Sequence, residues 1–169
     1  MKKLLVLFFI LVLSLVASCG YKFSGGGLLP GKTKLVSVEM FENKSSETGA
    51  EIIFSSALSS ELIEKSDSKV VDAKEAEASF IGVIKSVSIS TLTRTSTDAV
   101  IERKVSAVID LKMVSRDGEL LWFVKDFQGR EEFQVTTENI TDMASRTIAL
   151  EKIAERMAQK AVSRMLDDF

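Results

Sequence analysis

The reactive side chains of this sequence are few, and they narrow the chemistry that the chain could perform. Cys19 is the only cysteine, and there is no histidine. Histidine usually activates a cysteine or serine nucleophile and is a common zinc ligand, so such catalytic sites and zinc sites are not expected. Acidic pairs occur at Glu131-Glu132 and Asp167-Asp168, but neighbouring residues on a strand point to opposite faces. The sequence therefore predicts no enzyme, no metal and no cofactor, with Cys19 as the one thiol available for modification.

The residues before Cys19 have the layout of a secretory signal. Lys2 and Lys3 give a positive start, and Leu4 to Leu13 form an unbroken apolar run. This run is shorter than the roughly 20 residues that span a bilayer, so we expect a cleaved signal rather than a retained helix. An ordinary signal peptide that ends at a chance cysteine is the alternative.

The segment Val16-Ala17-Ser18-Cys19 resembles the lipobox of bacterial lipoproteins. This resemblance implies cleavage after Ser18, an S-diacylglycerol group on the Cys19 thiol and an N-palmitoyl group on the new amine. Several acyl chains hold a protein on a membrane far more firmly than one, because each buried methylene contributes about 0.8 kcal/mol. Gly20 is not the aspartate associated with inner-membrane retention, so the resemblance implies sorting to the outer membrane.

Composition and spacing predict how the chain is divided. We expect a signal peptide at residues 1–18, an acylated flexible tether at residues 19–34 and a single domain at residues 35–169. Cleavage would remove Lys2 and Lys3, so the 22 basic residues become 20 against 24 acidic ones. This acidic balance argues against nucleic acid as a partner.

Helical periodicity predicts two amphipathic helices. The first begins at a capping box of Thr48 and Glu51 and runs to about Lys65, and the second is capped by Asn139 or Thr141. Their apolar stripes are Ala50, Ile53, Phe54, Ala57, Leu58 and Leu62 in the first helix, and Leu150, Ile153, Ala154, Met157, Ala158, Ala161, Val162, Met165 and Leu166 in the second.

Alternating apolar residues predict the strands of one sheet. The expected strands cover residues 35–41, 79–90, 100–114 and 120–127, with a short extended segment at Val70-Val71. A hairpin turn at Ser115 to Glu119 joins the last two, and the last strand continues past a bulge at Gly129. The predicted fold class is α+β: a two-layer sandwich in the order β-α-β-β-β-α, with both helices packed on one face of a roughly four-stranded mixed sheet.

The expected strands also predict which side chains share a face. Val36, Val38 and Met40 should lie on one face of the first strand. In the second strand, Ile81, Val83, Val87 and Ile89 alternate, interrupted by Lys85, and Phe80 and Ile84 occupy the other face. Both faces of that strand are therefore expected to be partly covered.

A series of motifs along the chain, each weak alone, resembles the LptE family when taken in order. They are Cys19-Gly20-Tyr21-Lys22-Phe23, Leu29-Pro30, Phe41-Glu42-Asn43-Lys44-Ser45, Leu58 with Glu61-Leu62, Asp117-Gly118-Glu119-Leu120-Leu121-Trp122, and a closing helix that ends at Phe169. The resemblance covers essentially the whole mature chain. LptE proteins are lipoprotein subunits of the outer-membrane lipopolysaccharide translocon.

This resemblance implies a fold, two partners and a location. The family has the same two-layer sandwich, plugs and helps to assemble a large LptD-like β-barrel, and binds lipopolysaccharide. It implies a protein held on the outer membrane by its lipid anchor, with its domain facing the periplasm or inside the barrel lumen.

Lipopolysaccharide binding in the family involves basic residues on or near the strand loops. Arg94, Arg103 and Lys104 flank the expected loop between the second and third strands and are the candidates here. Cations suit the phosphates of lipid A, and arginine can bind them with two hydrogen bonds. For each residue the alternative is a solvated surface charge or a salt bridge to Glu102.

A different envelope lipoprotein of similar build is the alternative function. Such a protein would serve a secretion channel or activate a peptidoglycan synthase, and the Phe41 to Ser45 segment is also similar to lipoproteins of that kind. The partner that co-purifies would distinguish the two functions.

Overall fold

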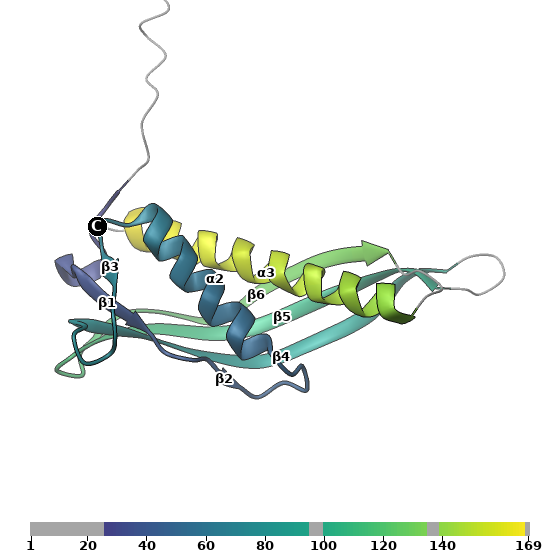
Figure 1. Cartoon of the computed structure of the whole chain (residues 1–169), viewed down its shortest axis with the longest axis horizontal. Coiled ribbons are helices and arrows are strands. Elements are labelled where there is room, and N and C mark those ends of the chain that lie inside the picture. Colours follow the sequence, from purple (N-terminus) through teal and green to yellow (C-terminus); the bar gives the residue numbers. More distant parts are fainter. Residues whose placement is uncertain (1–25, 95–99, 135–138, 168–169) are drawn as a thin grey trace, which may run out of the picture.

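The computed structural model describes residues 26–94, 100–134 and 139–167. Two helices lie on the same face of one sheet, as Figure 1 shows. The sheet has six strands in the order β3-β1-β4-β5-β6, with β2 paired to β4. The predicted α+β sandwich is confirmed. The sheet has more than the roughly four strands expected, because two of its strands are only two residues long and show no pattern in the sequence.

Strands and helices are interspersed along the described chain. They are η1 (Pro30–Lys32), β1 (Leu35–Val38), β2 (Glu42–Asn43), α2 (Ala50–Lys65), β3 (Lys69–Val70), β4 (Ala78–Arg94), β5 (Val100–Ser115), β6 (Leu120–Gln134) and α3 (Asn139–Asp167).

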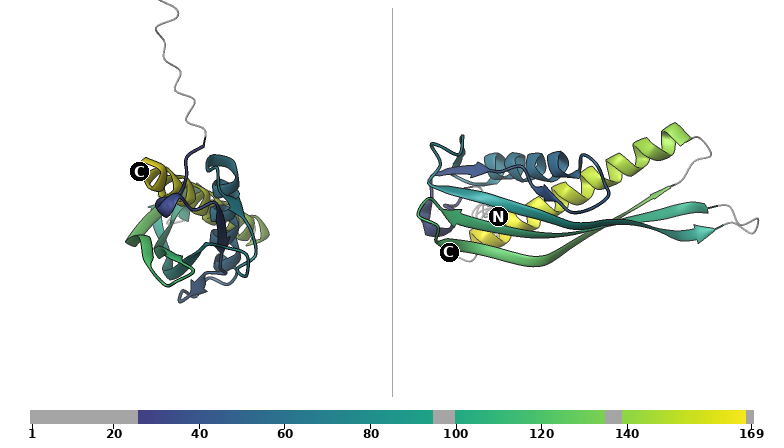
Figure 2. Two further views of the ribbon diagram at one scale, coloured as in Figure 1. Left: turned by 90° about the vertical axis from the view of Figure 1, so that its left-hand side faces the viewer. Right: turned by 90° about the horizontal axis from the view of Figure 1, so that it is seen from below.

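Strands β4, β5 and β6 form a long antiparallel meander that gives the molecule its length (Figure 2). Ala78 pairs with Ser115 at one end, which we call the proximal end, and Arg94 pairs with Val100 at the other, the distal end. At about 3.3 Å per residue, β4 is about 55 Å long. The short strands β1, β2 and β3 pair in parallel, β3 with β1 and both β1 and β2 with β4.

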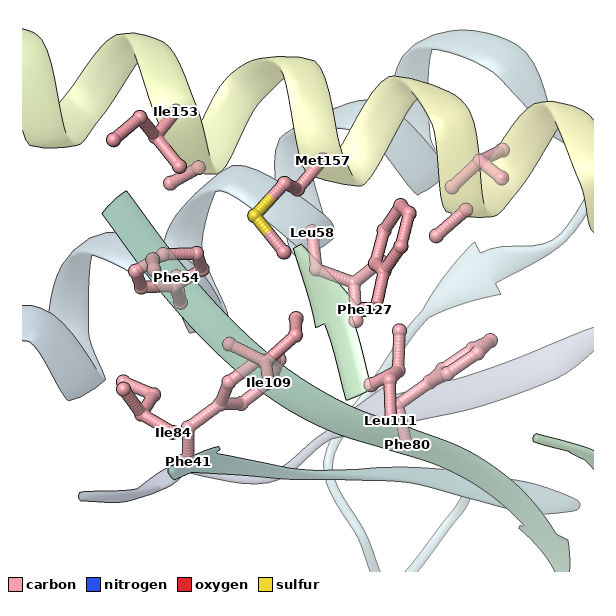
Figure 3. Packing of buried hydrophobic residues seen from close by; sticks show 14 of the residues in the cluster. Phe41, Phe54, Leu58, Phe80, Ile84, Ile109, Leu111, Phe127, Ile153 and Met157 are labelled. Atoms are coloured by element: carbon pink, nitrogen blue, oxygen red, sulfur yellow. The ribbon is translucent and has the colours of Figure 1, made fainter. Parts of the chain in front are cut away.

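The core lies between the sheet and the two helices (Figure 3). Alternate residues of β5 from Val105 to Met113 are buried, as their period of two predicts. The predicted stripe of α3 is also confirmed: its residues from Leu150 to Met165 are at most 6% exposed, and only Leu166 at its end is half-buried. Phe54, Leu58 and Leu62 of α2 complete the helical layer.

Two glycines let the core pack closely against the sheet. A Cβ at Gly82 would lie 2.5 Å from the Phe41 ring, and one at Gly129 would lie 2.6 Å from Ile153 Cγ2 and would also overlap the Met157 side chain. Gly129 keeps a regular register with Ala107, so the predicted bulge at Gly129 is wrong. The glycine is needed because α3 crosses β6 at this point.

Helix α2 begins differently from the prediction. Its N-cap is Gly49, which has a φ of +87°, and not Thr48. The Glu51 carboxylate instead accepts a hydrogen bond of 2.7 Å from the Asn43 side-chain amide. The predicted capping box is therefore wrong, and the contact that holds this helix end comes from β2.

Strand β1 is shorter than predicted. It ends at Val38, so the expected alternation does not reach Met40, which is 64% exposed. Ser37 is buried on the other side of the strand, and its hydroxyl shares a hydrogen bond of 2.8 Å with the Ser79 hydroxyl of β4. A buried polar residue is thus satisfied across the parallel pair.

The described part of the segment expected to be a tether packs on the domain. Leu29 is 1% exposed, and the Thr33 hydroxyl donates to the Pro30 carbonyl at 2.7 Å. The Ser68 hydroxyl donates to the Thr33 carbonyl, also at 2.7 Å. Packed structure therefore begins before residue 35.

Candidate functional site

The predicted site residues are spread over the chain. Cys19 lies outside the described residues. Arg94 ends β4, and its backbone pairs with Val100 at the distal end. Arg103 and Lys104 lie in β5 close to the same end, where β5 also pairs with the last residues of β6.

The sheet separates Arg103 from Lys104. Arg103 pairs with Phe133, which is buried, and is in the same row as the buried Val105, so it lies on the helix-facing side. Lys104 pairs with Ser90 and Glu132, which are both exposed. Because adjacent strand residues point to opposite faces, these two cations cannot bind the same phosphate group from one face.

The face of the sheet away from the helices, here called the outer face, is polar in its distal half. Ser88, Ser106 and Arg130 form one cross-strand row, and Ser90, Lys104 and Glu132 form the next. Hydroxyl and charged groups of this kind suit contact with water or with a polar partner surface. Lys104 is half-buried within this polar region.

Bulges in β4 and β6 change the outer face near its middle. The register of β4 shifts between Ile84 and Ser86, and that of β6 shifts between Val124 and Phe127. Residue Asp126, within the second bulge, has a φ of +51°. Both bulges lie opposite the same part of β5. The side chains of β4 and those of β6 therefore change from one face of the sheet to the other at the same point along β5.

Asp110 of β5 connects the two bulges. Its carboxylate accepts a hydrogen bond of 2.7 Å from the Asp126 backbone N–H and lies 3.7 Å from Lys85 Nζ. Lys85 also forms an ion pair with the Asp126 carboxylate. This cluster fixes the point at which the polar distal half of the outer face ends.

The proximal half of the outer face carries an apolar hollow, which we call the sheet hollow. Its volume is about 310 Å³, and its floor includes Ile81, Val83 and Phe123. Phe123 is 63% exposed, so the hollow is open to solvent. Lys112 and Lys125 also line it, and neither forms an ion pair with a described residue. An apolar floor beside two ammonium groups suits an acyl chain that carries an anionic head group.

The alternation of apolar residues in the sequence does not predict the sheet hollow, because β4 does not keep the same residues on one face along its whole length. In the structure Val87 and Ile89 pair with the buried residues Ala107 and Val105 on the helix side, whereas Ile81 pairs with Lys112 on the outer side. The one sign of the bulge in the sequence is Lys85, which interrupts the expected alternation of apolar residues.

Across residues 26–94, 100–134 and 139–167, no cluster of three or more acidic, cysteine or histidine side chains could hold a metal ion. No helix in these same ranges has the length and apolar character needed to cross a membrane.

Known structures share this fold. Rare lipoprotein B from Shewanella oneidensis has a TM-score of 0.51 at 12% identity, covering 80% of this chain and 96% of the other. Lipoprotein B from Nitrosomonas europaea has a TM-score of 0.50 at 18% identity, covering 87% and 88%. Identities this low support the fold alone.

The sequence comparison is more specific about the family. No curated protein gave a significant match to the chain. Residues 33–165, which include every described strand and nearly all of α3, match the family LptE, described as lipopolysaccharide-assembly. The chain therefore belongs to the LptE family.

Proposed function

We propose that this protein is a lipid-anchored outer-membrane lipoprotein that partners a large LptD-like β-barrel and helps to deliver lipopolysaccharide to the outer leaflet. In this proposal it catalyses no reaction. The family match over residues 33–165 is the observation that carries it.

The polar rows of the outer face support a place inside a barrel. The lumen of an outer-membrane barrel is polar, so a protein within it needs a surface that does not require burial in lipid. The rows of Ser88 and Ser90 with their β5 and β6 partners provide such a surface over the distal half of the sheet.

The position of the first described residues bears on the orientation of the protein. A Cβ at Gly27 would lie 3.1 Å from Leu166 Cδ2, so the start of the described chain lies beside the end of α3, at the proximal end (Figure 2). Six residues separate Cys19 from Gly26, so the distance between these two residues is at most about 25 Å. An acylated Cys19 would hold the proximal end near the membrane and leave the distal end far from it.

We propose two places for contact with lipopolysaccharide. Arg94, Arg103 and Lys104 would bind lipid A phosphates at the distal end, as the family resemblance suggests. The sheet hollow would bind an acyl chain, with Lys112 and Lys125 beside its anionic head group. Lys104 and the sheet hollow share the outer face, which would allow one lipid to pass from one to the other.

Depletion of the protein tests this function in cells. We expect less lipopolysaccharide at the cell surface and its accumulation in the inner membrane. Surface labelling of intact cells measures the first of these. Normal surface lipopolysaccharide after full depletion would contradict the proposal. Labelling with palmitate tests the anchor separately, since a Cys19→Ala chain should incorporate none.

A further inference from the structure

A second surface feature lies on the helical layer, away from the sheet hollow and from the cations of the distal end. A groove of about 610 Å³ opens to solvent between α2 and α3. Ile52, Ile53 and Ala57 of α2 supply its apolar surface, and Ile52 is 56% exposed. Apolar surface left uncovered between two helices is a common feature of protein interaction sites.

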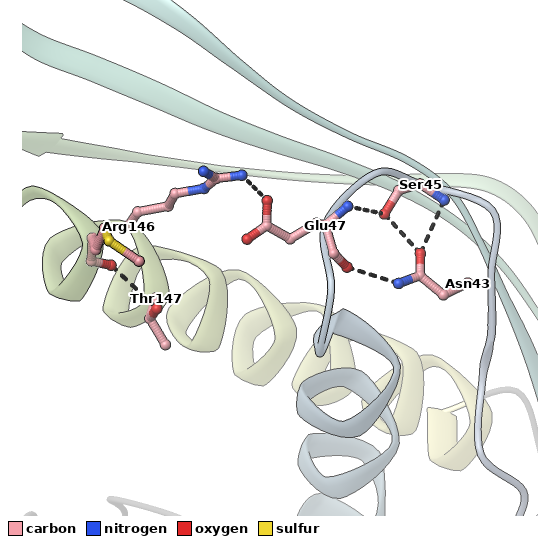
Figure 4. Close-up of polar contacts among 6 residues, drawn as sticks. Asn43, Ser45, Glu47, Arg146 and Thr147 are labelled. Carbon is pink, nitrogen blue, oxygen red and sulfur yellow. Dashed lines mark hydrogen bonds and ion pairs between the residues drawn. The ribbon is translucent and has the colours of Figure 1, made fainter.

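The two helices that form this groove are joined near the start of α2. Glu47, just before α2, forms an ion pair with Arg146 of α3 (Figure 4). The Glu47 carbonyl accepts a hydrogen bond of 2.7 Å from the Asn43 amide, and Ser45 donates to Asn43 Oδ1, also at 2.7 Å. These contacts hold the start of α2 beside α3, the two helices that line the groove.

The walls of the groove are acidic. Glu61 and Glu64 line it from α2, and Glu151 and Glu155 line it from α3. Among the described residues that line it there is no lysine or arginine. Lys65, next to the groove, pairs with Glu64 at 2.8 Å, but both side chains are largely exposed, so this pair is weak.

Glu61 is the most enclosed of these four acidic residues. The residue is 9% exposed, and its carboxylate forms no hydrogen bond or ion pair with a described residue, although its oxygens still reach the solvent in the groove. Burial, and then the neighbouring Glu64 carboxylate, raise the pKa of Glu61 above its ordinary value. A carboxylate held in this partly desolvated place favours a cationic partner.

The chemistry of the groove limits what that cation could be. The described acidic residues do not form a cluster that could hold a metal ion. The exposed Ile52 side chain needs an apolar partner, which a free inorganic cation cannot supply. An occupant that combines apolar groups with ammonium or guanidinium groups fits both features.

The dimensions fit a short helix. Along α2 the groove runs from Ile52 to Glu64, which is about 18 Å at 1.5 Å per residue. Glu151 and Glu155 are one turn apart on α3, so they match lysine or arginine residues spaced by three or four positions on a neighbouring helix.

We propose that the groove between α2 and α3 is a docking site for a short cationic amphipathic helix of a partner protein. Its lysine or arginine side chains pair with Glu61, Glu64, Glu151 and Glu155, and its apolar face covers Ile52 and Ile53. This site is on a different surface from the sheet hollow and does not depend on lipopolysaccharide binding.

Peptide binding to the purified full-length protein in a neutral maltoside detergent tests the proposal. The probe is a fluorescein-labelled amphipathic helix of 14 leucine, alanine and lysine residues, and the matched probe has glutamate at every lysine position. Fluorescence anisotropy, corrected with protein-free micelles, should show saturable one-to-one binding of the cationic probe and none of the anionic probe. Absence of saturable binding of the cationic probe would overturn the proposal.

Charge-neutral variants locate the binding site. Glu61→Gln with Glu155→Gln should weaken binding at least about tenfold, because these carboxylates would pair with cations in a partly desolvated interface. The matched control, Glu75→Gln with Glu119→Gln, changes the net charge equally at turns outside the groove and should bind like the parent. Equal loss in both pairs, or no loss in the groove pair, would overturn the proposal.

A stability measurement separates docking from folding. Glu61→Gln should keep or raise the melting temperature at pH 7, since the raised pKa of Glu61 means that folding disfavours its charged form, while it weakens peptide binding. If that variant were unfolded, the exposed pair Glu151→Gln with Glu155→Gln gives the same test. Full-strength binding by a folded variant of either kind would contradict docking in the groove.

Discussion

Lys85 in the bulge of β4 and Asp126 in the bulge of β6 form an ion pair across the intervening strand β5. The hydrogen bond between these side chains raises the pKa of Lys85 and lowers the pKa of Asp126. Asp110, between them on β5, binds both the Lys85 ammonium group and the Asp126 backbone. The two bulges are therefore coupled. Together they set the boundary between the polar and apolar halves of the outer face.

Asp110→Ala should loosen this coupling. It leaves the Asp126 N–H without its acceptor and removes one of the two carboxylates beside Lys85, which should lower the free energy of unfolding by about 1 kcal/mol. Urea titration of the variant measures this. Lys125→Ala, in the same bulge but without an ion pair, is the control and should be near neutral.

Gly129→Ala should destabilise the domain by about 1–3 kcal/mol, because the added methyl group would overlap Ile153 and Met157 of α3. In an Ile153→Ala background the same change should cost clearly less, since the two sites share one space. Additive effects in this double-mutant cycle would show that α3 does not rest on Gly129.

The lowered pKa of Glu77 predicts that the free energy of unfolding falls in acid. The backbone N–H groups of Lys34, at 2.8 Å, and of Leu35, at 3.3 Å, hold its pKa below the ordinary 4.5. The unfolded chain therefore takes up this proton first, so the contribution is present above pH 4.5 and is lost as the pH falls through the lower, folded pKa. Thermal unfolding from pH 7 to pH 3 should show a smaller fall for Glu77→Gln than for the parent or for Glu75→Gln.

Much of the fold follows from the sequence because its long elements have strong periods. The stripe of α3 and the position of β5 were predicted correctly, since each has a period that repeats over many residues. Strands β2 and β3, with two residues each, are too short to show a period. The cap of α2 and the face of Met40 were predicted wrongly because Asn43 and the early end of β1 decide them, and both depend on tertiary contacts.

The candidate site was less predictable. Local sequence placed Arg94, Arg103 and Lys104 near one loop, but the strand register puts Arg103 and Lys104 on opposite faces. The sheet hollow joins Ile81 to Phe123, which are distant in the sequence and meet only through β5. No spacing rule brings such residues together before the pairing of the strands is known.

Charge reversal on each face should show where lipopolysaccharide binds. Arg94→Glu with Arg103→Glu, and separately Lys112→Glu with Lys125→Glu, should each weaken binding of purified lipopolysaccharide about tenfold or more. The control, Lys69→Glu with Lys74→Glu, makes the same charge change at the proximal end and should bind normally. Circular dichroism should be unchanged in all three, and unchanged binding in a folded pair would exclude that place as a binding site.

Co-purification from detergent-solubilised outer membranes tests the central claim most directly. The affinity-tagged full-length protein should bring down a large β-barrel in a stable one-to-one complex, identified by mass spectrometry and by heat-modifiable migration on gels. Recovery of a secretion channel or a peptidoglycan synthase in its place, or of no barrel at all, would contradict the proposed role in lipopolysaccharide assembly.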